Sequence, residues 1–228
     1  MKAILFDCDG TIADSFATIC TVMRRAFAAE GLPEPEDAAT KAIIGLSLEV
    51  AMARLHPDGV DADHSRLAAA YREAFHATRA EAGHRETLFP GMRDLIDRLA
   101  AREDVALGMV TGKSRRGVAA ICEEHGMGHV FIASRTADDC PSKPHPAMVE
   151  ECCAELGLET TDALVVGDSI YDMEMARSAG AAALGVAWGT HQADRLLSAG
   201  AFAVAEDVAA LDRLIGDWLA GARTAATA

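Results

Sequence analysis

Basic residues and long apolar runs are both scarce in this sequence. Lys and Arg number 21 against 35 Asp and Glu, which gives a formal net charge of −14. A surface with this excess of negative charge repels a phosphate backbone, which argues against nonspecific nucleic-acid binding. The first apolar stretch, residues 3–6, is too short for a signal peptide or a membrane span. We therefore expect a cytoplasmic protein that binds neither nucleic acid nor membrane.

Aromatic residues and cysteine motifs are also sparse. Aromatic residues make up 5% of the chain, so the core must be mainly aliphatic. The six cysteines form no C-x-x-C pair, and no histidine stands near them at the spacing of zinc ligands. We expect reduced thiols that pack as small core residues. The 228 residues, half of them hydrophobic and a quarter charged, suit a globular core domain that carries a smaller one.

Short apolar runs alternate with helix-like segments over most of the chain. The runs are apolar throughout, which is typical of strands buried on both faces. Glycines follow several of the helical segments as C-terminal caps. Alternating strands and helices predict a doubly wound, parallel α/β sheet of Rossmann-like type. The predicted strands are residues 2–6, 105–110, 130–133, 163–166, 182–187 and 202–205, and the helices are 92–102, 116–125, 146–156 and 170–179.

One interval, residues 15–83, contains no strand-like run. Helical patterns occupy it instead, at 17–29, 47–55 and 64–80. We therefore predict a core domain formed by residues 1–14 and 84–228, and an inserted helical cap domain formed by residues 15–83. An insertion after the first strand overhangs the carboxyl ends of the strands, where ligands bind in this architecture.

Carboxylates and one lysine follow the predicted strands. Asp7 and Asp9 come after the first strand, Lys143 after the third, and Asp168 and Asp172 after the fourth. A carboxylate can attack phosphorus as a nucleophile, and a hard divalent cation such as Mg²⁺ is then needed to bridge two anionic partners. Asp7 and Asp168 suit that metal, and Asp172 can orient a metal-bound water.

The remaining polar groups suit the handling of a phosphoryl group. Asp9 can protonate the leaving oxygen and later activate water. Lys143 can neutralise charge in the transition state, and Thr111 can donate a hydrogen bond to a phosphoryl oxygen. Gly10 lets backbone amides turn toward the same oxygens.

Together these residues resemble the four motifs of the haloacid dehalogenase-like hydrolase superfamily. The resemblance implies that Asp7 is the nucleophile and a Mg²⁺ ligand. It also implies that Asp9 supplies its backbone carbonyl to the metal and its side chain to proton transfer. Dehalogenases and phosphonate hydrolases of the superfamily carry another residue at the position of Asp9, so a phosphate-ester enzyme is favoured. The motif residues are Asp7, Asp9, Gly10, Thr11, Thr111, Lys143, Gly167, Asp168 and Asp172.

Other parts of the sequence indicate the class of substrate, and two alternatives to a phosphatase stay open. Stretches such as 141–146 and 186–189 are similar to phosphoglycolate phosphatase-like members, which implies a small phosphorylated metabolite and a monomeric or homodimeric enzyme. Sugar-phosphate mutases of the β-phosphoglucomutase type resemble the chain around Gly45 and Ser47, but carry a basic residue where this chain has Leu48. A non-hydrolytic phospho-aspartate switch is the third alternative. The expected substrate-binding residues are Gly10, Thr11, Gly45, Ser47, Thr111, Gly112 and Lys143, and the expected metal-binding residues are Asp7, Asp9, Asp168 and Asp172.

Overall fold

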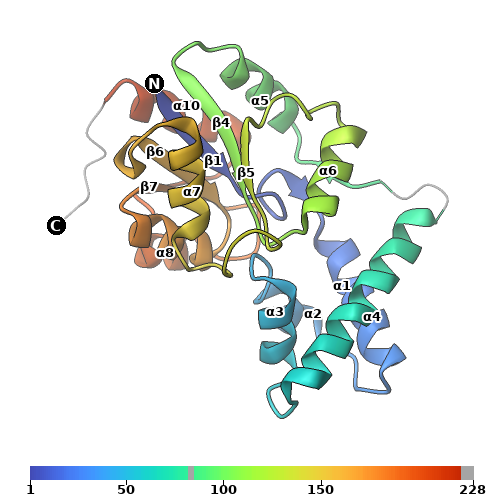
Figure 1. Ribbon diagram of the computed structural model, residues 1–228. Helices are drawn as coiled ribbons and strands as arrows, with labels where there is room; N and C mark the ends of the chain where they lie inside the picture. Colours follow the sequence, from blue (N-terminus) through green and yellow to red (C-terminus); the bar gives the residue numbers. More distant parts are fainter. Residues whose placement is uncertain (82–84, 222–228) are drawn as a thin grey trace.

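A six-stranded parallel sheet forms the centre of the protein in the computed structural model, which describes residues 1–81 and 85–221 (Figure 1). The strand order is β5-β4-β1-β6-β7-β8, with β1 and β6 adjacent at the centre. The sheet confirms the predicted doubly wound α/β fold. Its strands are β1 (Lys2–Phe6), β4 (Val105–Val110), β5 (Ala133–Arg135), β6 (Ala163–Gly167), β7 (Ala182–Val186) and β8 (Ala203–Ala205).

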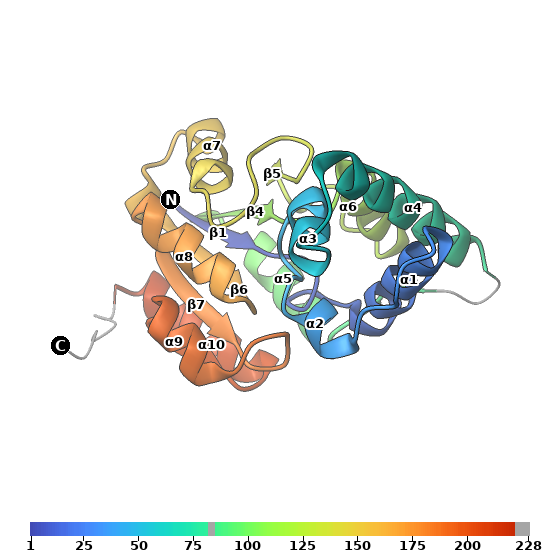
Figure 2. The same cartoon turned by 90° about the horizontal axis from the view of Figure 1, so that it is seen from below.

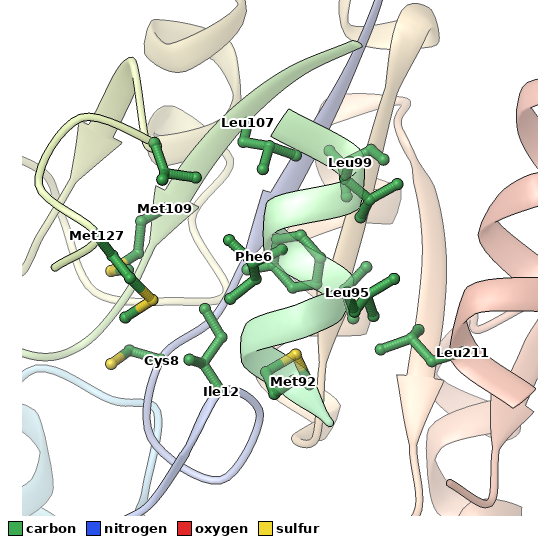
Figure 3. Close-up of a cluster of buried hydrophobic side chains, with 14 of the residues drawn as sticks. Phe6, Cys8, Ile12, Met92, Leu95, Leu99, Leu107, Met109, Met127 and Leu211 are labelled. Atoms are coloured by element: carbon green, nitrogen blue, oxygen red, sulfur yellow. The ribbon is translucent and has the colours of Figure 1, made fainter. Parts of the chain in front are cut away.

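Helices cover both faces of this sheet, because alternate residues of each strand point to opposite faces. Ile4 and Phe6 of β1 pack with α5 and α10 on one face, and Leu5 packs with α7 and α8 on the other. Figure 3 shows Phe6 at the centre of the first of these layers. The core helices are α5 (Met92–Ala100), α6 (Arg115–Glu124), α7 (Ala147–Leu156), α8 (Ile170–Ala179), α9 (Ala193–Ala199) and α10 (Val208–Leu219), with a short 3-10 helix at Thr160–Asp162.

The helical insertion lies at one end of the sheet (Figures 1 and 2). Its helices are α1 (Phe16–Ala29), α2 (Asp37–Lys41), α3 (Leu48–Leu55) and α4 (Asp61–Ala80). Met23, Met52 and Leu67 are buried in a small apolar cluster that also includes Tyr171 of α8. The two connections to the sheet domain pair as a short antiparallel ladder, β2 (Ala13–Asp14) with β3 (Thr87–Leu88). The predicted boundary between residues 83 and 84 lies outside the described residues.

Two details differ from the sequence-based expectations. The predicted strand at 130–133 is wrong in position, since Val130 closes a turn by donating its amide hydrogen to the Met127 carbonyl and β5 begins only at Ala133. The helices α2, α9 and α10 were not predicted. The glycines predicted to end helices include Gly157 after α7 and Gly180 after α8, and both have the left-handed conformation that ends a helix.

All six cysteines are buried, and within the described residues they form no disulfide. Of the helices described, none has the length and apolar character needed to cross a membrane.

Candidate active site

Three acidic side chains meet where β1 and β6 end. Asp7 follows β1, Asp168 follows β6, and Asp172 lies in the first turn of α8. One carboxylate oxygen from each lies within 4.8 Å of the other two, and all three side chains are buried. The structure therefore brings together three of the predicted metal-binding residues.

Lys143 completes this buried cluster from the loop before α7. Its Nζ lies 2.6 Å from Oδ1 of Asp172 and 2.9 Å from Oδ1 of Asp7. Burial alone lowers the pKa of Lys143, but Asp172 and Asp7 outweigh that effect and hold the pKa above its usual range. The lysine is therefore a fixed cation beside Asp7, where the sequence predicted it.

Neighbouring groups fix the orientation of two of the carboxylates. Thr11 Oγ1 donates to Oδ1 of Asp168 at 2.9 Å, and the amide and hydroxyl of Thr190 both donate to Oδ2 at 2.8 Å. The amide and hydroxyl of Ser169 donate to Oδ2 of Asp172 in the same way, at 3.1 and 2.6 Å. Thr11 thus positions Asp168, and its predicted contact with substrate stays a prediction.

Two glycines allow the loops to approach Asp168 closely. A Cβ atom on Gly10, whose φ is +84°, would lie 2.3 Å from Oδ2 of Asp168. A Cβ atom on Gly189 would lie 2.2 Å from the Cβ of the same residue. Any larger side chain at either position would displace the carboxylate.

Asp7 differs from its neighbours because its carboxylate lacks hydrogen bonds. Neither oxygen accepts a hydrogen bond from the described residues, although Lys143 forms an ion pair with it. Burial raises the pKa of Asp7 to about 8, and burial with the nearby Asp172 raises the pKa of Asp168 to about 6. Three buried carboxylates, of which Asp7 has an ion pair with Lys143 but no further polar partner among the described residues, fit a hard divalent cation that takes oxygen ligands, as Mg²⁺ does.

Asp9 lies outside the acidic group and pairs with a different lysine. Lys113 Nζ lies 2.8 Å from Oδ1 of Asp9 and 2.8 Å from Oε1 of Glu86. Glu86 comes from the second connection to the cap, next to β3. The side chain of Asp9 thus shares a cavity wall with Asp7 but does not join the three-acid group, and the predicted metal contact through its backbone carbonyl stays a prediction.

The loop before α3 rests directly on the sheet domain. The Ser47 amide donates to Ser142 Oγ at 2.8 Å, and a Cβ atom on Gly112 would lie 2.6 Å from the Leu46 carbonyl oxygen. Gly45, Thr111 and Gly112 line a cavity of about 130 Å³ between cap and core, with Asp7 and Asp9 also in its wall. Three of the expected substrate-binding residues, Gly45, Thr111 and Gly112, therefore share one space. Gly10 lines a separate cavity, Lys143 belongs to the acidic group, and Thr11 and Ser47 make contacts between protein groups.

Sequence reasoning missed several groups that shape this site. Lys113 follows Thr111-Gly112 at the end of β4, and this position at a strand end was the available signal. Ser169 stands three residues before Asp172 in the S-x-x-D pattern of a capping box at the start of α8, so it also had a local signal. No local pattern marks the other three, since each lies far along the chain from its partner. The missed residues are Lys113, Glu86, Ser169, Gly189 and Thr190.

Known proteins resemble this chain over most of its length. The family described as haloacid dehalogenase-like hydrolase matches residues 4–186. The chain is 30% identical to phosphoglycolate phosphatase of Rhodospirillum rubrum over 226 residues, covering 96% of this chain and 90% of that protein. It is 32% identical to phosphoglycolate phosphatase of Yersinia pestis over 194 residues, covering 83% and 82%. Among solved structures, a hydrolase from Pseudomonas syringae superposes with a TM-score of 0.83 at 25% identity, covering 95% of this chain and 99% of that one.

Proposed function

The chain belongs to the haloacid dehalogenase-like hydrolase family, and we propose that it is a Mg²⁺-dependent phosphatase acting on small phosphate monoesters through a phospho-Asp7 intermediate. The observation that carries this proposal is the state of Asp7. Its buried carboxylate is paired with Lys143 alone among the residues that the structure describes, and it lies beside two further acids in the wall of a cavity. A carboxylate held in this way is available to attack phosphorus.

Asp7, Asp168 and Asp172 would hold the metal ion, together with the backbone carbonyl of Asp9. Bound Mg²⁺ would neutralise the repulsion between these carboxylates and an anionic substrate. The cluster has three acids and one lysine, so it repels phosphate unless a cation is present. Substrate binding should therefore depend on the metal.

The reaction needs two transfers of the phosphoryl group, and the chain supplies the groups for both. An oxygen of Asp7 attacks phosphorus, the bond from phosphorus to the alcohol oxygen breaks, and Asp9 donates a proton to that oxygen. Asp9 then takes a proton from water, which attacks the phosphoryl group and releases Asp7. Lys143 offsets negative charge during both transfers.

The substrate is proposed to resemble phosphoglycolate in size, as a phosphate ester of a short alcohol. Two features support a small substrate: the cavity of about 130 Å³ between cap and core, and the relatives named phosphoglycolate phosphatase. The β-phosphoglucomutase-like and phospho-aspartate switch alternatives use the same nucleophile, so turnover decides among the three.

A phosphate-release screen in Mg²⁺ over phosphoglycolate, alkyl and aryl phosphates, sugar phosphates and nucleotides tests the proposal. We expect release from at least one small ester and none after chelation. A parallel assay for conversion of glucose 1-phosphate to glucose 6-phosphate separates the mutase. Efficient conversion without phosphate release, or stable phosphorylation of the protein without turnover, would contradict a phosphatase.

A further inference from the structure

The cavity beside Asp7 has two chemically different ends. Acidic and hydroxyl groups of the sheet domain, among them Asp7, Asp9 and Thr111, form one end. The helical cap forms the other end, and its contribution is almost wholly apolar. Five of the apolar side chains on this wall are Ile19, Met23, Ile44, Leu46 and Phe75, and Tyr71 adds a ring that carries a hydroxyl.

Positive charge within the cavity wall is already neutralised. Of the described residues that line the cavity, two are cationic, Lys113 and Arg72. Lys113 lies between Asp9 and Glu86, and Arg72 Nη2 lies 2.6 Å from Oε1 of Glu49. A second anionic group on a substrate would therefore meet no cation without a carboxylate partner among these lining residues.

The size of the cavity sets a limit on what it can hold. At about 130 Å³ it is close to an engineered apolar cavity of about 150 Å³ that binds benzene. Part of the space next to Asp7 is needed for the phosphoryl group. The remainder suits a short branched chain or a single ring.

We propose that the alcohol released from the substrate is apolar, and that a carboxylate-bearing ester such as phosphoglycolate is a poor substrate. This inference rests on the proposed phosphatase function and specifies its substrate class. Hydrolysis consumes one water, breaks the bond between phosphorus and the alcohol oxygen, and yields inorganic phosphate and the alcohol. The alcohol packs against Met23, Leu46 and Phe75, away from the reacting oxygens.

The physical basis is the difference between two kinds of desolvation. An apolar group gains free energy when it leaves water for this wall. A carboxylate in the same place loses its hydration and finds no unpaired cation, which is unfavourable. This difference in desolvation free energy remains when two substrates have the same shape, so a pair of shape-matched esters can measure it.

Isobutyl phosphate and phosphoglycolate form such a pair, because an isopropyl group replaces a carboxylate of nearly the same shape. We expect kcat/KM for isobutyl phosphate to exceed that for phosphoglycolate by at least about ten-fold. Equal values, or a preference for phosphoglycolate, would overturn the inference and leave the proposed phosphatase intact.

A variant pair tests whether the cap wall is the cause. Leu48 lies on this wall at the start of α3. Leu48→Lys brings a cation to the cavity, and Leu48→Met brings a chain of similar length without charge. We expect only Leu48→Lys to move the preference toward phosphoglycolate. If both variants move it equally, the charge argument is wrong.

A binding measurement separates this inference from the proposed function. Titration calorimetry in Mg²⁺ compares 3-methylbutylphosphonate with 3-phosphonopropionate, which are non-hydrolysable analogues of the two esters. Tighter binding of the alkyl phosphonate supports the apolar site even if no ester is hydrolysed. Lack of hydrolysis of every ester would reject only the proposed phosphatase. Tighter binding of 3-phosphonopropionate overturns the apolar site whatever the activity.

Discussion

Lys113 Nζ lies 2.8 Å from Oδ1 of Asp9, and this ion pair holds the proposed acid-base group beside the nucleophile. The same ammonium lies 2.8 Å from Oε1 of Glu86, in the connection to the cap. Burial opposes the charged form of Lys113, yet Asp9 and its other neighbours raise the pKa well above its usual range. One buried cation thus joins the phosphoryl site to the base of the cap.

Loss of this lysine should damage both stability and turnover. In Lys113→Met, Glu86 would remain buried without a partner, since its side chain is 1% exposed. We expect the free energy of unfolding to fall by about 3–5 kcal/mol, measured by urea denaturation. We also expect kcat to fall about ten-fold or more, because Asp9 would no longer be held in place.

The Glu86 carboxylate provides the matched control for this prediction. The double variant Lys113→Met/Glu86→Gln removes the unpaired charge, so it should recover most of the lost stability but not the lost kcat. If the double variant is no more stable than Lys113→Met, the buried Glu86 charge is not the cause. If its kcat returns to the wild-type value, Lys113 does not position Asp9.

Replacement of the nucleophile should abolish turnover without unfolding the protein. Asp7→Asn keeps the shape of the side chain but removes the attacking oxygen charge, and we expect phosphate release to fall by more than about 1,000-fold. Burial raises the pKa of Asp7 to about 8, so its charged form is disfavoured in the fold. The metal-free variant should therefore melt no lower than the wild type at pH 8.5.

The exposed Asp217 on α10 offers the control substitution for Asp7. Asp217→Asn makes the same chemical change far from the cluster and should retain wild-type turnover. Wild-type activity in Asp7→Asn would reject the phospho-Asp7 intermediate. A large loss of thermal stability in the metal-free variant would show instead that Asp7 is needed for folding.

Much of the fold follows from local sequence patterns. Residues 3–6 and 163–166 are apolar at every position because helices cover both faces of the sheet, and that pattern does not depend on distant partners. The start of β5 was misplaced because Val130 is as apolar as a strand residue but belongs to a turn. The short helix α2 carries one buried side chain, so it shows no apolar periodicity.

The site was predictable where its members follow strand ends. Asp7, Lys143, Asp168 and Asp172 fall in that class, and the parallel sheet brings them together. Glu86 does not follow a strand end of the central sheet. Its position beside Lys113 depends on the path by which the chain returns from the cap to the sheet domain. The apolar wall of the cavity was equally hidden, since residues that line it look like ordinary core residues of amphipathic helices.

The close approach of Gly189 to Asp168 predicts a metal-binding defect. A Cβ at Gly189 would lie 2.2 Å from the Cβ of Asp168, so Gly189→Ala must displace this carboxylate or its loop. We expect Mg²⁺ affinity to fall about 10- to 100-fold, measured by calorimetry. Gly216→Ala is the control, because among the described residues outside its own turn of α10 no atom lies within 4 Å of the added methyl. That helical change should raise stability by about 0.5–1 kcal/mol and leave Mg²⁺ affinity unchanged.

The raised pKa values of Asp7 and Asp168 predict how stability responds to pH and to Mg²⁺. The pKa of each carboxyl in the fold lies well above its usual value of 3.8, at about 8 for Asp7 and about 6 for Asp168. Between those values and 3.8 the folded protein binds more protons than the unfolded chain, so these groups lower the stability of the metal-free protein as pH rises. Mg²⁺ requires the deprotonated carboxylates and removes their repulsion. The rise in Tm on adding Mg²⁺ should therefore be larger at pH 8 than at pH 6, measured by calorimetric scans. Asp7→Asn should reduce this difference, and an equal Mg²⁺ effect at both pH values would contradict the coupling.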